Sequence, residues 1–260
     1  MLLIRKGKNL FRFQRRLQTL PPPAQFATLI AVAFLAATLA AVTGFGGAAV
    51  LLPVLVVAYG VREAIPILTV AQLLGNGSRV WLNRRAIVFP VVGWFALGGV
   101  PAALLGGFLF AKAPLSALTR ALGGFLILLV VWRHARRMPP RMPLRGFTVL
   151  GACSSFLSAL LGSVGPLMAP FFLAYGLVKA AYIGTEALTT VIMHVTKLVA
   201  YRQAAVLSTH ALLAGASLTP AMIAGSYVGK RIVDRLPERV FIAIIEVTLL
   251  AAGALFLWRG

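Results

Sequence analysis

The stretch Thr43-Gly44-Phe45-Gly46-Gly47-Ala48 has a counterpart in Leu161-Gly162-Ser163-Val164-Gly165-Pro166, and these two stretches decide the fold. Each follows a long apolar run and precedes a short one, residues 48–59 in the first case and 167–175 in the second. Glycine weakens a helix by roughly 1 kcal/mol per residue and proline by roughly 3 kcal/mol. Two such clusters at matching places therefore predict two breaks in helices.

The rest of the chain has the composition of a membrane protein. Of its 260 residues, 60% are hydrophobic and 12% are charged, whereas soluble domains carry about 25% charged residues. Non-helical backbone at membrane depth is tolerated only where it is buried in protein or lines a cavity. Interrupted hydrophobic segments at corresponding places in two halves indicate the binding site of a transporter. We therefore expect an all-α polytopic membrane protein.

The net charge of +20 does not indicate a nucleic-acid partner, because the basic residues lie outside the long apolar runs. They cluster in residues 5–16, 84–85, 133–145 and 230–239. This distribution is typical of the loops and termini of a membrane protein. Residues 1–24 form a basic cytoplasmic segment, and residues 2–20 within it are either an amphipathic helix on the membrane lipid or disordered.

The apolar runs predict two halves of about four transmembrane segments each, in residues 25–133 and 146–260, joined by a basic linker in residues 134–145. The first half contains expected segments at 25–42, 48–59, 64–82, 88–110 and 115–132, with turns at 60–63 and 111–114. The second half contains a broken segment at 147–175 and spans at 180–201, 211–228 and 240–258.

The two halves also share residues in order, which indicates an internal duplication. Ala58-Tyr59-Gly60 matches Ala174-Tyr175-Gly176, and Thr69 matches Thr185 at the same offset of 116 residues. Pro101 and Arg120 match Pro220 and Arg239 at an offset of 119.

Two topologies are compatible with these segments. If each broken segment crosses once, the chain makes eight crossings, the halves are parallel, and the N-terminus, Arg84-Arg85, the linker and Arg202 share the cytoplasmic side. The excess of Lys and Arg on that side favours this topology, with both termini cytoplasmic. If each broken segment is instead a re-entrant hairpin, each half makes three crossings and the halves are inverted.

Taken together, the doubled glycine-rich break, the Ala-Tyr-Gly after it and the Pro-Ala-x3-Gly of the third span resemble the TauE/SafE sulfite exporter family. The resemblance covers about residues 26–258. It implies a bacterial inner-membrane permease for small anions, chiefly sulfite, sulfonates and related organosulfur compounds. It also maps the family's substrate region onto Gly44, Gly46, Gly47, Gly162, Gly165 and Pro166. The chain departs from the family's triple-glycine runs at Ala48 and at Ser163-Val164.

The chemistry of the breaks agrees with an anionic substrate. A helix that starts at a break leaves its first N–H groups unpaired, and its dipole places positive charge there, so an anion binds at such a terminus. We expect hydroxyl and amide donors around it from Thr43, Thr69, Gln72, Asn76, Ser163 and Thr185. The alternative is that the glycines only allow close packing of helices.

A second group of candidate residues follows one face of a later span. Glu186, Thr190, His194 and Lys197 fall within an arc of about 80° at 100° per residue. A charge at mid-bilayer costs about 2.5–3.5 kcal/mol and usually faces the interior. These side chains form either a proton relay, since histidine titrates near neutral pH, or a structural polar cluster. We expect Lys197, and also Arg79 in the first half, to snorkel to the interface.

Other polar residues receive structural interpretations. We expect Cys153 to be buried in a helix, Glu246 to form an ion pair, His210 to start a helix at the surface, and His134 to be solvated. The chain has neither an H-E-x-x-H motif nor a phosphate-binding loop, so we expect no enzyme activity, no cofactor and no metal.

These observations predict a secondary transporter that carries small anions by alternating access, with protons as the coupling ion. Two alternatives stay open: an uncoupled anion channel, and a non-transporting membrane scaffold or binding component. A homo-oligomer is compatible with the sequence.

Overall fold

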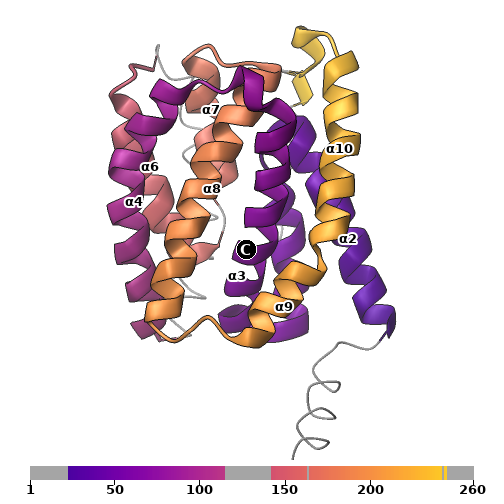
Figure 1. Cartoon of the computed structure of the whole chain (residues 1–260), viewed down its shortest axis with the longest axis vertical. Helices are drawn as coiled ribbons and strands as arrows, with labels where there is room; N and C mark the ends of the chain where they lie inside the picture. The colour runs from indigo at the N-terminus through magenta and orange to yellow at the C-terminus, as the bar shows by residue number, and fades with distance from the viewer. Residues whose placement is uncertain (1–22, 115–141, 163, 242, 245–260) are drawn as a thin grey trace, which may run out of the picture.

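The computed structural model describes residues 23–114, 142–162, 164–241 and 243–244, and throughout these ranges the regular structure is helical. Figure 1 shows long helices packed side by side into a bundle. The helices are α2 (Pro23–Thr43), α3 (Gly47–Asn83), the 3-10 turn η1 (Arg84–Ala86), α4 (Phe89–Lys112), α6 (Gly146–Leu161), α7 (Gly165–Ala174), α8 (Lys179–Gln203), α9 (Thr209–Ser217) and α10 (Thr219–Arg235).

Several of these helices are long and apolar enough to cross a membrane. The qualifying stretches are Ala24–Thr43, Val50–Ala86, Phe89–Lys112 and Thr209–Arg235, and a span needs about 20 residues. The protein is therefore a multi-pass membrane protein. The spans expected at 115–132 and, for the most part, at 240–258 lie outside the described residues, as do His134 and Glu246.

The helix bounds correct three details of the sequence analysis. The turn expected at 60–63 is a kink at one residue, because only Gly60 leaves helical geometry within α3, with φ 73° and ψ 160°. The span expected at 211–228 is two helices that meet at Leu218, just before Pro220. The basic residues from Lys230 to Arg235 belong to α10 and not to a loop.

The direction of each helix follows from pairs of residues that touch. Gly225 of α10 packs on Phe34 of α2, and Gly229 packs on Ala41, so α2 and α10 run the same way. The part of α3 after Gly60 runs with them, since Val70 meets Gly215 and Gly75 meets Met222.

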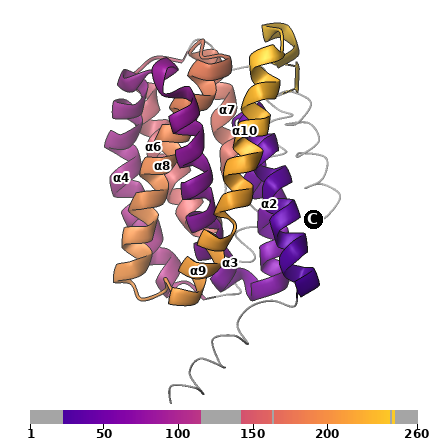
Figure 2. The ribbon, with the colours of Figure 1, turned by 45° about the vertical axis from the view of Figure 1, so that its right-hand side comes forward.

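Helices α4, α6 and α8 run the opposite way. Gly98 and Gly106 of α4 touch Thr148 and Phe156 of α6 in the same order. Helix α8 starts where α3 ends, with Gly184 against Asn83. Figure 2 gives a second view of this arrangement. Helices α2 and α6, which lead into the two breaks, therefore approach the middle of the bundle from opposite ends.

Both broken segments turn back instead of crossing. At the second break, the Met142 N–H donates to the Ala174 carbonyl at 3.4 Å and the Phe147 ring contacts Tyr175, so α7 returns to the end where α6 begins. At the first break, Gly47 packs on Ala36 and Ala40 of α2, and the chain runs back to the kink at Gly60.

The expectation of eight crossings with parallel halves is therefore wrong. It treated each break as a bend within one crossing, whereas the backbone reverses there. The same geometry separates the basic residues: Arg84-Arg85 follow the end of α3, and Arg202 lies at the far end of α8. The expectation that they share one side of the membrane is wrong as well.

Cys153 also departs from expectation. It lies on α6, but its side chain is exposed and not buried. Its neighbours Gly151, Ser154 and Ser155 form the buried face of the helix that packs on α4. Cys153 points away from that face.

Candidate functional site

The first break is built from glycines in conformations that other residues avoid. Gly44 has φ 82° and Gly46 has φ 90°, in the left-handed region where a Cβ causes strain. A Cβ at Gly44 would also lie 2.2 Å from a ring carbon of Tyr182. The Thr43 hydroxyl lies 2.6 Å from the Phe45 carbonyl oxygen and thereby closes the turn.

The second break has similar geometry with fewer free amides. Gly162 ends α6 with φ 85°, and its N–H donates to the Ser158 carbonyl. Helix α7 begins at Gly165, followed by Pro166, which has no N–H to offer. The N–H groups of Leu167 and Met168 both donate to the Val164 carbonyl. Ser163 lies outside the described residues.

The two breaks meet around one small cavity. A Cβ at Gly165 would lie 2.7 Å from the Cβ of Phe45, so the turns are in contact. The cavity beside them has a volume of about 40 Å³. A single water needs roughly 10–15 Å³ by the same measure, so this space suits a small oxyanion better than a large molecule.

The two breaks and the five helices α2, α3, α6, α7 and α8 supply the walls of the cavity. The breaks contribute backbone, and most of the polar side chains come from α3 and α8, with Ser158 of α6. The lining residues are Ala40, Gly44, Phe45, Gly46, Gly47, Ala48, Gln72, Asn76, Arg79, Ser158, Gly162, Val164, Gly165, Met168, Glu186, Thr190, Met193 and His194.

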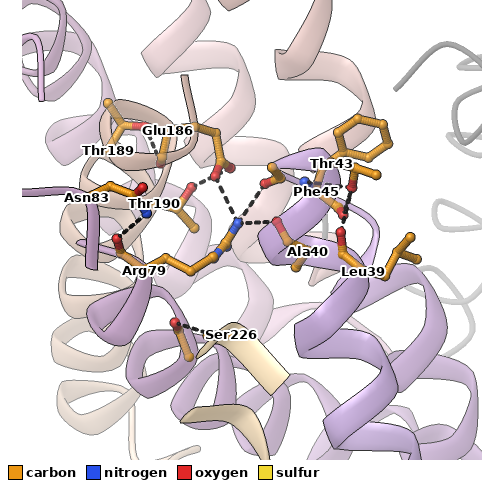
Figure 3. Close-up of polar contacts among 12 residues, drawn as sticks. Leu39, Ala40, Thr43, Phe45, Arg79, Asn83, Glu186, Thr189, Thr190 and Ser226 are labelled. Atoms are coloured by element: carbon orange, nitrogen blue, oxygen red, sulfur yellow. Dashed lines mark hydrogen bonds and ion pairs between the residues drawn. The ribbon is translucent and has the colours of Figure 1, made fainter. Parts of the chain in front are cut away.

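Arg79 is the central polar residue of this site. Its Nη1 donates to the carbonyl oxygens of Ala40 at 2.8 Å and Gly44 at 2.9 Å, and it lies 3.5 Å from Oε2 of Glu186 (Figure 3). The residue is only 4% exposed. The expectation that Arg79 snorkels is therefore wrong: α2 ends beside it, and the carbonyls of Ala40 in the last turn of α2 and of Gly44 just after it accept hydrogen bonds from its guanidinium.

Glu186 is held at only one of its two oxygens. Its Oε1 accepts a hydrogen bond from the Thr190 hydroxyl at 2.9 Å. Its Oε2 has no hydrogen-bond partner among the described residues, and the same is true of Gln72 Nε2, both polar side-chain atoms of Asn76, and His194 Nδ1. Buried polar atoms nearly always have partners. Several unpartnered atoms around one cavity indicate a bound ligand or water.

Lys197 is completely buried, and the expectation that it snorkels is wrong. Its Nζ donates to the Ser158 hydroxyl at 3.1 Å. Ser158 lines the cavity, so the lysine lies directly behind one wall. The lysine stands one helical turn beyond His194, on the face of α8 that packs into the bundle.

Some of the predicted site residues do not reach the cavity. The Thr69 hydroxyl donates to the Ile65 carbonyl, and the Thr185 hydroxyl accepts from the Val88 N–H. The Thr43 hydroxyl closes the turn of the first break, and the side chain of Pro166 lies outside the described part of the structure. In contrast, Gln72, Asn76, Glu186, Thr190, His194 and five glycines of the breaks do line it.

Sequence reasoning missed Arg79 and Ser158 as lining residues. For Arg79 a signal existed, because Gln72, Asn76 and Arg79 stand at positions i, i+4 and i+7 and so share one helix face. For Ser158 no comparable pattern existed. Within the described residues, no three His, Cys, Asp or Glu side chains gather in a way that could hold a metal ion.

Comparison with known families gives one match. The family described as Sulfite exporter TauE/SafE matches residues 29–256. This protein belongs to that family. The resemblance inferred from the doubled break is thus confirmed, and TauE/SafE proteins are membrane transporters and not enzymes. Comparisons with curated proteins and with solved structures gave no match.

Within this TauE/SafE protein, the arrangement suits one chemical task. Backbone amides at two helix starts, a guanidinium and several unpaired amide donors converge on a space of a few water molecules. Such donors bind oxygen atoms of an anion.

Proposed function

We propose that this protein is a secondary transporter of the bacterial inner membrane that carries small anions of the sulfite and sulfonate type through the cavity between the two breaks. The observation that carries the proposal is the set of unpartnered polar atoms around the cavity. Asn76 Nδ2, Gln72 Nε2 and the N–H groups at the start of α3 can all donate to the oxygens of one anion.

The arrangement of the hairpins supports alternating access. The hairpin of α2 with the first part of α3 and the hairpin of α6 with α7 reach the cavity from opposite ends. We infer that they are inverted repeats, in which rocking of one half against the other opens the same site to each side in turn.

The test is flux into proteoliposomes that hold the full chain, with sulfite and methanesulfonate as substrates. Asn76→Leu removes two unpartnered polar atoms from the cavity wall without a large change of volume. We expect this variant to lose transport while its unfolding temperature stays level or rises, because a buried unsatisfied group is removed.

The matched control is Thr219→Val, which removes a hydroxyl that has no hydrogen-bond partner among the described residues and does not line the cavity, and which should leave flux unchanged. Equal flux in the wild type and Asn76→Leu would place the transport path elsewhere. If electrical recordings give an ion flow far faster than the turnover of a carrier, the protein is a channel. If neither anion is transported, the scaffold alternative is the one that survives.

Protons are the proposed coupling ion, with Glu186 and His194 as the relay. Both line the cavity. The charged and titratable groups around them are Arg79 on α3 and Tyr182 and Lys197 on α8. We expect Glu186→Gln to abolish the dependence of flux on a pH gradient, and a dependence that persists in this variant would exclude the relay.

A further inference from the structure

The contact between Arg79 and Glu186 is looser than a buried ion pair needs to be. Nη1 lies 3.5 Å from Oε2, beyond hydrogen-bond geometry, and both side chains are about 5% exposed. Strong carboxylate–guanidinium pairs instead form two parallel hydrogen bonds at 2.7–2.9 Å. Here the two N–H groups of Nη1 donate to the carbonyls of Ala40 and Gly44.

The remaining donors of the guanidinium are unused. Arginine carries five N–H groups, and the hydrogen bonds of Arg79 to other described residues all leave from Nη1. Oε2 of Glu186 likewise accepts no hydrogen bond within the described part of the chain. Both residues line the cavity. N–H donors of Arg79 and a carboxylate oxygen of Glu186 that accepts no hydrogen bond from the described residues therefore lie beside the same small space.

The buried ionisable groups contain one more base than acid. Among the described residues, Arg79 and Lys197 are the buried basic side chains and Glu186 is the buried carboxylate, so with all three ionised the site carries one net positive charge. A single negative charge in the cavity would complete the balance. A second negative charge would be left uncompensated in a buried site, which is strongly unfavourable.

We propose that Glu186 determines which anions the site accepts: its carboxylate stays by Arg79 in the empty cavity, gives way to an anion of one negative charge, and excludes anions of two. This inference rests on the proposed function. The arriving oxygen atoms take the free N–H groups of Arg79, while Thr190 keeps its hydrogen bond to Oε1. Sulfonates and hydrogen sulfite carry one negative charge and fit this rule, whereas sulfate carries two.

The experiment measures thermal stabilisation of the purified full chain by methanesulfonate and by sulfate, since a ligand of the folded state raises its stability. The wild type should bind methanesulfonate and not sulfate. Glu186→Gln keeps the shape and the acceptor for Thr190 but removes the charge. We expect it to bind methanesulfonate about tenfold more tightly, a change of about 1.4 kcal/mol, because no carboxylate competes for Arg79, and we expect it to bind sulfate too.

Glu186→Asp separates competition from simple repulsion. It keeps the negative charge but draws the carboxylate back from Arg79 by one methylene. Methanesulfonate should bind more tightly than in the wild type, and sulfate should still be excluded. The control is Glu63→Gln, a carboxylate near His210 at the molecular surface, which should change neither affinity.

The proposal is overturned if folded Glu186→Gln binds methanesulfonate no better than the wild type and still excludes sulfate. It is also overturned if the wild type binds sulfate as tightly as methanesulfonate, or if Glu186→Asp weakens the binding of methanesulfonate. Should Glu186→Gln not fold, the Glu186→Asp result decides. Wild-type flux of methanesulfonate tests the transporter proposal separately, so the two can fail independently.

Discussion

A single guanidinium connects three parts of the molecule. Arg79 on α3 donates to the carbonyls of Ala40 at the end of α2 and of Gly44 in the first break, and it lies beside Glu186 on α8. The four terminal carbonyls of a helix need partners outside it. Arg79 donates to one of them, that of Ala40, and to the Gly44 carbonyl in the turn that follows, so it stabilises the turn as well as lining the cavity.

We therefore expect Arg79→Lys to destabilise the protein by about 1–3 kcal/mol. Lysine keeps the charge but lacks the planar fork that reaches both carbonyls. The unfolding temperature in detergent measures the effect. The matched change is Arg84→Lys, at an exposed arginine over Trp81, where we expect little difference. Equal unfolding temperatures for both variants would show that the carbonyl contacts of Arg79 contribute nothing.

For single residues, the sequence predicted which polar side chains line the cavity better than it predicted how deeply the basic side chains are buried. Gln72, Asn76, Glu186 and His194 stand out because polar residues in apolar runs usually face the interior. Arg79 and Lys197 were misjudged because each lies close to a helix end. Nearness to an end says little about depth when another helix terminates alongside, as α2 does at Arg79.

The elements of the bundle approach each other most closely at glycines. A Cβ at Gly98 of α4 would lie 2.1 Å from the Thr148 carbonyl oxygen, and a Cβ at Gly151 of α6 would lie 2.2 Å from the Phe95 carbonyl oxygen. Small residues allow such contacts between membrane helices. Close packing of this kind occurs between α4 and α6, and it also occurs at the breaks, where a Cβ at Gly47 would lie 2.7 Å from the Ala36 carbonyl oxygen.

We expect Gly98→Ala to lower stability by about 1–3 kcal/mol, because the new methyl group forces the α4 and α6 backbones apart. Gly93→Ala on the same helix is the control, since a Cβ there would have no atom within 4 Å. Thermal unfolding of both variants measures the difference. A loss as large at Gly93 as at Gly98 would contradict close packing as the cause, because alanine by itself favours a helix over glycine.

The positions of both breaks were predictable from glycine and proline, whereas the direction of the chain after each break was not. A glycine with positive φ reverses the chain or only bends it, depending on its neighbours. The reversal is visible only through contacts such as Met142 with Ala174. These pairs are distant in sequence, and no local pattern encodes them.

For the whole molecule, the reversals change which loops share a side. Counting Lys and Arg favoured the wrong topology because the count depended on the assumed number of crossings. Arg62 and Ala111 meet at one end, joined by a 2.8 Å hydrogen bond. Arg84, Arg85 and the start of α8 lie at the other end.

Labelling of single cysteines tests this arrangement. In a Cys153→Ser background, Arg85→Cys and Arg202→Cys place thiols at exposed positions on opposite ends of the bundle. We expect a membrane-impermeant maleimide added to intact cells to label one of them and not the other. Labelling of both from the same side would contradict the hairpin arrangement.

The proline at the start of α7 makes the two helix termini at the cavity unequal. The α3 terminus presents its first amides freely, whereas Pro166 removes one from α7 and Val164 takes up two more. If an anion occupies this cavity as proposed, we expect it to be held more firmly on the α3 side, so that the barriers to inward and outward escape differ in height. Net flow would still cease when the electrochemical potentials are equal, but away from that balance the solute should pass faster in one direction than in the other.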